Sequence, residues 1–126
     1  MKILVIDDNA NMRTLLRLVL ERSYYVPLLA RHGKEGLDKA ITDKPKLILM
    51  DIRMPVMDGW EAVKALRANP DTKNIPILAT TALFLPHELK ACLDAGCNAY
   101  IVKPFSLLAL ESKIGELLAA RIAAEV

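Results

Sequence analysis

Four short apolar runs without polar alternation constrain the fold of this chain more than any other feature of its sequence. Strands with one face in water alternate between apolar and polar residues, whereas strands covered on both faces, as in parallel sheets, do not. The runs are ILVI, LILM, IPILAT and AYIV, at residues 3–6, 47–50, 75–80 and 99–102. We therefore predict that these four segments are buried strands of one parallel sheet.

A fifth strand and five helices complete the predicted pattern. The segment YYVPLL at 24–29 has strand character, but Pro27 cannot donate to a strand ladder, so we place it at the sheet edge. Apolar residues at helical spacing indicate the helices, with Asp8 or Asn9 capping the first and Ser106 capping the last. The predicted helices occupy about residues 12–20, 34–43, 59–68, 86–95 and 107–122. This alternation of strand and helix predicts a doubly wound α/β sheet with right-handed crossovers.

Length, charge and apolar runs exclude several classes of protein. A chain of 126 residues is long enough for one domain with its own core. The formal net charge of +2 is too small to indicate direct binding to nucleic acid or to an anionic membrane. The N-terminus MKILVIDD is not a signal peptide, and no apolar run approaches the roughly 20 residues of a membrane span. We expect a cytoplasmic protein without membrane insertion.

The two cysteines, Cys92 and Cys97, form neither a disulfide framework nor a metal site of known spacing. We expect reduced thiols that pack against the core or lie half exposed. Gly96, which stands between them, is predicted to end the helix at 86–95.

Polar and charged residues follow the predicted strands at the point where each strand ends. Ligands of open parallel sheets bind outside the carboxyl ends of the strands. Asp7 and Asp8 follow the first run, Asp51 the second of the four, Thr81 the third and Lys103 the last. Singly, these residues could be helix caps, turn residues or solvated side chains, but three clustered carboxylates repel one another unless a cation neutralises them. Because Mg²⁺ prefers carboxylate, carbonyl and water oxygens, the set predicts a magnesium site.

Four segments that contain these residues resemble the signature segments of receiver domains of two-component response regulators. They are VIDDNANMR, LILMDIRMPVMDGWE, PILATTA and AYIVKPF, and the resemblance extends over about residues 2–120. It implies a flavodoxin-like, five-stranded parallel sheet of strand order 2-1-3-4-5, in a single receiver domain over 1–126. It also implies that Asp51 accepts a phosphoryl group from a phosphohistidine of a sensor histidine kinase or a histidine phosphotransfer protein.

The resemblance also implies a role for each residue around the acceptor. Asp8 and Asp51 would be direct ligands of Mg²⁺, Asp7 would act largely through water, and the backbone carbonyl of Arg53 would complete the protein ligands. Phosphoryl transfer needs mainly positioning and positive charge around the phosphoryl oxygens. The implied catalytic residues are Asp51, Thr81 and Lys103. The family often has a cis peptide bond at the position of Lys103–Pro104.

Switching and the lifetime of the phosphorylated state would depend on further residues. Thr81 and Tyr100 match the switch positions of the family, although Tyr100 could equally be a half-buried strand residue. Arg53 could lean over the phosphoryl group and alter the access of the hydrolytic water, or it could be a solvated arginine at the rim. The apolar loop that follows the third run could tuck onto the core or form part of a partner face with the fourth helix, fifth strand and fifth helix. Its residues are Leu83, Phe84 and Leu85.

We expect a stand-alone phosphorelay intermediate or diffusible switch, a monomer or weak homodimer, that acts on a downstream protein target. A receiver that is part of a longer regulator is one alternative. A phosphorylation-independent adaptor is another, although such proteins usually lose an acid, the lysine or the acceptor, and this chain keeps them. A phosphohydrolase that turns over small substrates commonly has a second acid where this chain has Arg53. The protein would instead catalyse only its own phosphoryl transfer and autodephosphorylation.

Overall fold

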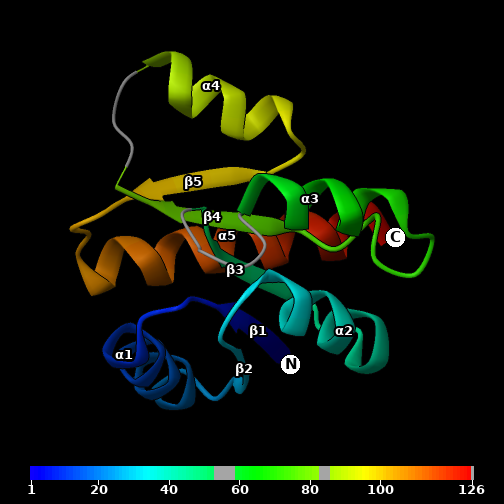
Figure 1. Ribbon diagram of the computed structural model, residues 1–126. Coiled ribbons are helices and arrows are strands. Elements are labelled where there is room, and N and C mark those ends of the chain that lie inside the picture. Colours follow the sequence, from blue (N-terminus) through cyan, green and yellow to red (C-terminus); the bar gives the residue numbers. More distant parts are fainter. Residues whose placement is uncertain (53–58, 83–85, 126) are drawn as a thin grey trace.

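Five parallel strands form one sheet in the order β2-β1-β3-β4-β5, and five helices connect them (Figure 1). The computed structural model describes residues 1–52, 59–82 and 86–125. The strands are β1 (Lys2–Ile6), β2 (Val26–Ala30), β3 (Leu47–Asp51), β4 (Ile77–Thr81) and β5 (Ala99–Val102). The helices are α1 (Ala10–Arg22), α2 (Gly33–Asp43), α3 (Gly59–Ala68), α4 (Pro86–Asp94) and α5 (Leu107–Glu125). The predicted fold class and strand order are confirmed.

The central strands are apolar because both of their faces are covered. Alternate residues of β1 belong to different clusters: Leu4 and Ile6 lie in one core and Ile3 and Val5 in the other. The first core is completed by residues of α2, α3 and α4, and the second by residues of α1 and α5. Every residue of β3 and of β4 is buried, whereas β2 and β5 at the two edges are partly exposed. This is the arrangement that non-alternating apolar strands predict.

The ends of several elements follow local chemistry visible in the sequence. Asn9 caps α1, since its Oδ1 accepts from the backbone N–H of Met12 (2.9 Å). Ser106 caps α5 in the same way, with its Oγ accepting from the N–H of Ala109 (3.0 Å). Strand β2 contains Pro27 and lies at the sheet edge, as predicted. These contacts explain why the predicted boundaries are nearly correct.

Two strands are placed differently from the prediction. Strand β2 runs over Val26–Ala30 rather than 24–29, because the N–H groups of Tyr24 and Tyr25 close the turn after α1 onto the carbonyls of Glu21 and Leu20 (3.0 Å each). Strand β4 begins at Ile77 rather than at Ile75, because the N–H of Ile75 closes a turn onto the carbonyl of Thr72 (3.1 Å). The strand also continues one residue further, to Thr81. Among the described residues, no helix is both long enough and apolar enough to cross a membrane.

Candidate functional site

Three carboxylates meet at the carboxyl edge of the sheet. Strands β1 and β3 are neighbours with Ile6 opposite Met50, so Asp7 and Asp51 come next to each other in adjacent strands. Asp8 follows directly, and carboxylate oxygens of the three aspartates lie within 4.8 Å of one another. Asp7 and Asp51 are buried and Asp8 is exposed. The cluster is therefore closed on the side of the core and open to solvent at Asp8.

The loop from β1 to α1 is held by hydrogen bonds to Asp7. Its Oδ1 accepts from the backbone N–H of Asn9 (2.9 Å), and its carbonyl accepts from Nη1 of Arg13 (2.8 Å). Its own N–H donates to the carbonyl of Ala30 at the end of β2 (3.1 Å). Because both backbone groups and one carboxylate oxygen are bound, the position of Asp7 is defined by three neighbouring segments of the chain.

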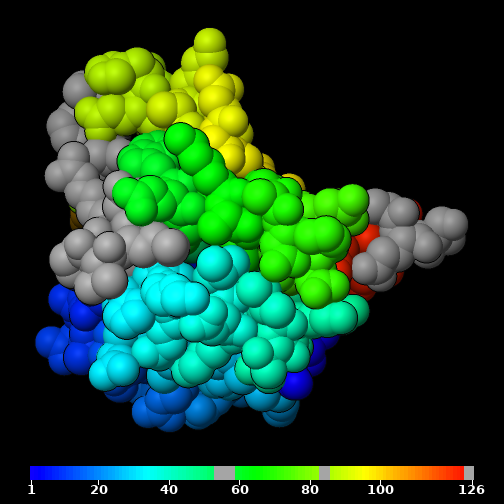
Figure 2. Space-filling view, turned by 45° about the vertical axis from the view of Figure 1, so that its right-hand side comes forward, coloured from blue at the N-terminus to red at the C-terminus, as the bar shows by residue number. Residues whose placement is uncertain are grey.

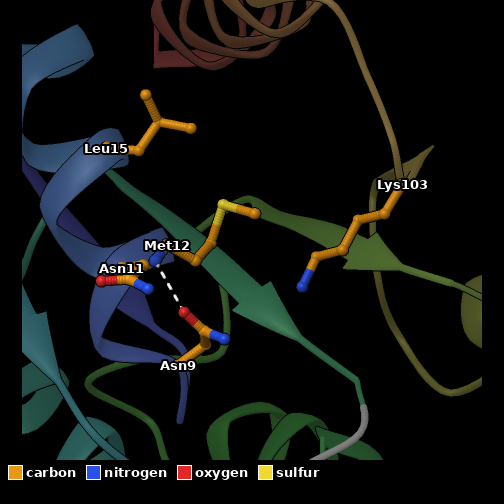
Figure 3. A pocket seen from close by; sticks show the side chains of 5 residues that line it. All are labelled: Asn9, Asn11, Met12, Leu15 and Lys103. Atoms are coloured by element: carbon orange, nitrogen blue, oxygen red, sulfur yellow. Dashed lines mark hydrogen bonds between the residues drawn. The ribbon is translucent and has the colours of Figure 1, made fainter.

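Lys103 brings a positive charge to the acids from the end of β5, the edge strand beyond β4. Its Nζ lies 3.4 Å from Oδ2 of Asp7 and 3.6 Å from Oδ2 of Asp51. The lysine follows β5, so its side chain crosses the end of β4 to reach them, and Figure 3 shows it extending toward the first turn of α1. Its backbone N–H is anchored on the carbonyl of Thr81 (2.7 Å).

The charges of these four side chains do not balance. Three carboxylates and one ammonium leave an excess of two negative charges, and two of the carboxylates are buried. A divalent cation is the ligand that this donor set suits, since hard cations such as Mg²⁺ prefer several anionic oxygens in one place. The acidic cluster is consistent with a magnesium site.

The other predicted site residues occupy the neighbouring strands. Thr81 ends β4 and is 1% exposed, and it lies opposite Val102 of β5. Tyr100 of β5 lies opposite Ala79, is half-buried and packs against the core beneath α3 and α4. The Lys103–Pro104 peptide bond is cis, as the resemblance implies. The predictions for Arg53, Leu83, Phe84 and Leu85 concern residues outside those that the structure describes.

A groove beside Lys103 is the feature of the site that the sequence did not predict. One cavity of about 330 Å³ is lined by Asn9, Asn11, Met12, Leu15 and Lys103 (Figure 3). A second cavity, of about 390 Å³, shares three of these residues and extends to the segment after β5. We call these two adjoining cavities the α1 groove. The helical spacing of Met12 and Leu15 predicted a core-facing stripe, but Leu15 is 39% exposed.

Comparisons with known proteins agree with this fold and site. The family model described as "Response regulator receiver domain" matches residues 3–115. The polar-differentiation response regulator DivK of Brucella anthropi is 36% identical over 105 residues, covering 83% of this chain and 85% of DivK. The response regulator MprA of Mycobacterium avium is 40% identical over 118 residues, covering 94% of this chain and 51% of MprA. The chain thus spans about half the length of MprA.

A solved structure matches the whole arrangement. The receiver domain of the sensor histidine kinase PA1611 from Pseudomonas aeruginosa has a TM-score of 0.87 and 32% sequence identity, covering 94% of this chain and 97% of that one. That protein was solved with a magnesium ion coordinated in its active site cleft. The chain described here belongs to the receiver domain family of response regulators.

Membership of this family defines the general activity. The protein is a phosphoacceptor response regulator of two-component signal transduction, with an acidic pocket formed by Asp7, Asp8 and Asp51. The family implies, in general, a histidine kinase as partner.

Proposed function

We propose that Asp51 receives the phosphoryl group, from a phosphohistidine of a sensor histidine kinase or a histidine phosphotransfer protein. The main observation behind this proposal is the close approach of the carboxylates of Asp7, Asp8 and Asp51. The Lys103 ammonium adds to it, since it lies 3.4 Å from Asp7 and 3.6 Å from Asp51. Lys103 pairs with both Asp7 and Asp51, whereas Asp8 lies at the open side. Of these acids, Asp51 is the one that matches the acceptor position of the family. The three aspartates would hold Mg²⁺, and the backbone carbonyl of Arg53 would join them.

The chemistry follows from this placement. A carboxylate oxygen of Asp51, ionised at neutral pH, attacks the phosphorus, and the phosphorus–nitrogen bond breaks with its electron pair leaving on the imidazole. Lys103 lies close enough to Asp51 to donate to a phosphoryl oxygen bonded there, and the Thr81 hydroxyl would donate to another. When bound, Mg²⁺ supplies positive charge to the phosphoryl oxygens. The side chains thus position the reactants and stabilise charge, and no separate general base is needed.

The phosphorylated state would be transmitted through β4 and β5. Thr81 and Tyr100 lie on these adjacent strands, so a movement of Thr81 toward the phosphoryl group would change the packing available to Tyr100. The α4-β5-α5 face, including residues 83–85, is then the surface on which a downstream protein would detect the change. We place this signalling in the cytoplasm, with the protein as a monomer or weak homodimer.

Incubation with Mg²⁺ and a small acyl phosphate donor tests the proposed function. We expect intact mass spectrometry to show a gain of one phosphoryl group, which is absent when a chelator removes the divalent cation. An adaptor that works without phosphorylation would gain no mass under either condition. Failure of the donor to label the chain in the presence of the cation would therefore contradict the proposal.

The α1 groove is where we propose that the protein donor docks. A phosphohistidine must reach Asp51, and the groove begins at Lys103, which contacts Asp51 directly. The groove then continues along the exposed side of Met12 and Leu15 to Pro104 and Phe105. An apolar surface continuous with the reactive site suits a helical partner whose own apolar face surrounds the histidine.

Leu15→Glu is expected to slow phosphoryl transfer from a phosphohistidine protein by about tenfold or more, because it places a charge in the apolar contact. Uptake from the small acyl phosphate should not change, since the substitution leaves the three aspartates and Lys103 in place. The matched control is Leu93→Glu, because Leu93 of α4 is 42% exposed and lies outside the α1 groove. Equal transfer rates for the two variants would show that the donor docks elsewhere.

A further inference from the structure

The last turn of α4 closes on the two cysteines of the chain. Beyond the helix, the N–H of Gly96 donates to the carbonyl of Leu93 (3.0 Å), and the N–H of Cys97 donates to the carbonyl of Cys92 (3.3 Å). Gly96 has φ of 122°. These features define a Schellman motif, whose second hydrogen bond brings the first and last residues of the turn together. In many proteins those two positions make only an apolar contact; here both carry thiols.

The thiols are in contact inside the core. Cys92 and Cys97 are 1% and 6% exposed and belong to the same core cluster. The Cys97 thiol donates a hydrogen bond to the Cys92 sulfur, which lowers the pKa of Cys92, although burial opposes this effect. The same hydrogen bond, together with burial, raises the pKa of Cys97. Of the two thiols, Cys92 is therefore the one whose pKa is lowered and which gives up its proton more readily.

A guanidinium lies over the turn. Nε of Arg67 donates to the carbonyl of Gly96 (2.9 Å), and its Nη2 donates to Oδ1 of Asn98 (2.8 Å). The positive charge of Arg67 acts on Cys97 and favours its ionised form. Cysteines beside cationic groups ionise and exchange more readily than cysteines in purely apolar surroundings.

We propose that Cys92 and Cys97 are a redox-active dithiol that closes to a disulfide across the C-terminal turn of α4. Disulfides require α-carbons close together and side chains that point toward each other. The backbone hydrogen bond from Cys97 to Cys92 brings the two residues together, and the hydrogen bond between their thiols shows that the sulfurs face each other. The disulfide would tie the end of α4 to the residue pair that precedes β5. This modification is independent of the phosphoryl chemistry at the strand ends.

The oxidant is a small disulfide such as oxidised glutathione. The Cys92 thiolate attacks one glutathione sulfur, forms a mixed disulfide and displaces a first glutathione thiolate. The Cys97 sulfur then attacks the sulfur of Cys92 and displaces the second. Two protein thiols are oxidised, one glutathione disulfide is reduced to two thiols, and the cysteine protons end on the glutathione sulfurs.

Local opening of α4 gives the oxidant access to these thiols. Cys92 is the one buried residue of α4, a helix that the structure describes in full. Figure 1 shows α4 above β5, and Figure 2 shows its yellow-green segment at the periphery of the molecule. A helix that buries a single side chain opens at low cost compared with global unfolding.

The equilibrium between dithiol and disulfide tests the proposal. The chain is brought to equilibrium in a series of reduced and oxidised glutathione mixtures, once folded and once unfolded in urea. Intact mass spectrometry after alkylation then counts the dithiol, mixed and disulfide forms. We expect the equilibrium constant for disulfide formation to be at least about tenfold larger in the folded chain, because the turn holds the sulfurs together. An equal or smaller constant in the folded chain would show that the pair is only the apolar contact of a helix end.

Two variants locate the effect. Cys97→Ser should accumulate a single glutathione adduct on Cys92. In the folded wild type that adduct should give way to the disulfide, and an equally persistent adduct there would contradict the pairing. Gly96→Ala keeps both thiols, but its Cβ would lie 2.9 Å from Cγ of Arg67 at a φ that side chains rarely adopt. In folded Gly96→Ala, the equilibrium constant for disulfide formation should fall toward the value of the unfolded chain. If it equalled the constant of the folded wild type, the turn would not be what brings the thiols together. Should Gly96→Ala fail to fold, the comparison of folded and unfolded wild-type chain still tests the proposal.

Discussion

Asp51→Asn is expected to take up the phosphoryl group at less than about one thousandth of the wild-type rate, because the amide is not a nucleophile at neutral pH. Asparagine has nearly the shape of aspartate, so the strand end and the pairing between β3 and β4 should persist. The measurement is phosphoryl incorporation from a small acyl phosphate with Mg²⁺, followed over time by intact mass spectrometry. The thermal unfolding of the variant shows whether its fold is retained.

Asp38→Asn provides the matched control for that experiment. Asp38 lies on α2, where its exposed side chain pairs with Lys34 (3.1 Å) and is not part of the acidic cluster. The same chemical change there should leave phosphoryl uptake at the wild-type rate. Incorporation that survives in Asp51→Asn would place the acceptor on another group, and peptide mapping of the labelled chain would then identify it.

Gly59→Ala is expected to lower the free energy of unfolding by about 3 kcal/mol, since it overpacks a site bounded by backbone. A Cβ at Gly59 would clash with the Cα of Ile52 and would lie 2.9 Å from the carbonyl oxygen of Asp51. The N–H of Gly59 also donates to the carbonyl of Ile52 (2.8 Å). Because the backbone cannot yield as a flexible side chain would, α3 must shift away from the end of β3. Urea denaturation measures the change.

Gly115→Ala is the control with the opposite expected sign. Gly115 lies in the interior of α5, and a Cβ there would meet nothing within 4 Å. Alanine should stabilise the protein by about 0.5–1 kcal/mol, because it restricts the unfolded chain and favours the helix. If the two glycine variants unfolded at the same urea concentration, this result would contradict the close packing of Gly59 in α3 against the end of β3.

The sheet was predictable because its strands have nothing polar to place on either face. Burial of both faces selects continuous apolar runs, and such runs are visible without any tertiary information, as in β3. The start of β4 was not predicted correctly, because Ile75 is as apolar as the strand that follows it and only its turn onto Thr72 separates them. The meeting of Asp7, Asp8 and Asp51 followed from their positions at strand ends.

The α1 groove shows where periodicity fails. Met12, Leu15 and Leu16 share helical spacing, yet Leu16 is buried and Leu15 is 39% exposed. Apolar residues at helical spacing indicate which side of a helix is apolar. That apolar side can be wider than the surface that neighbouring elements bury. Which residue remains outside depends on how α1 lies against the segment after β5, and that placement is a tertiary property.

The order of residues along the chain already defined which elements form, which strands are buried and which acids stand at strand ends, since these depend on local composition and period. Folding decided how far Lys103 reaches across β4 to the acids and which thiols touch beneath the turn after α4. It also decided that Leu15 remains uncovered. The physical reason is that contacts between side chains on separate elements depend on packing distances and angles that no single segment encodes.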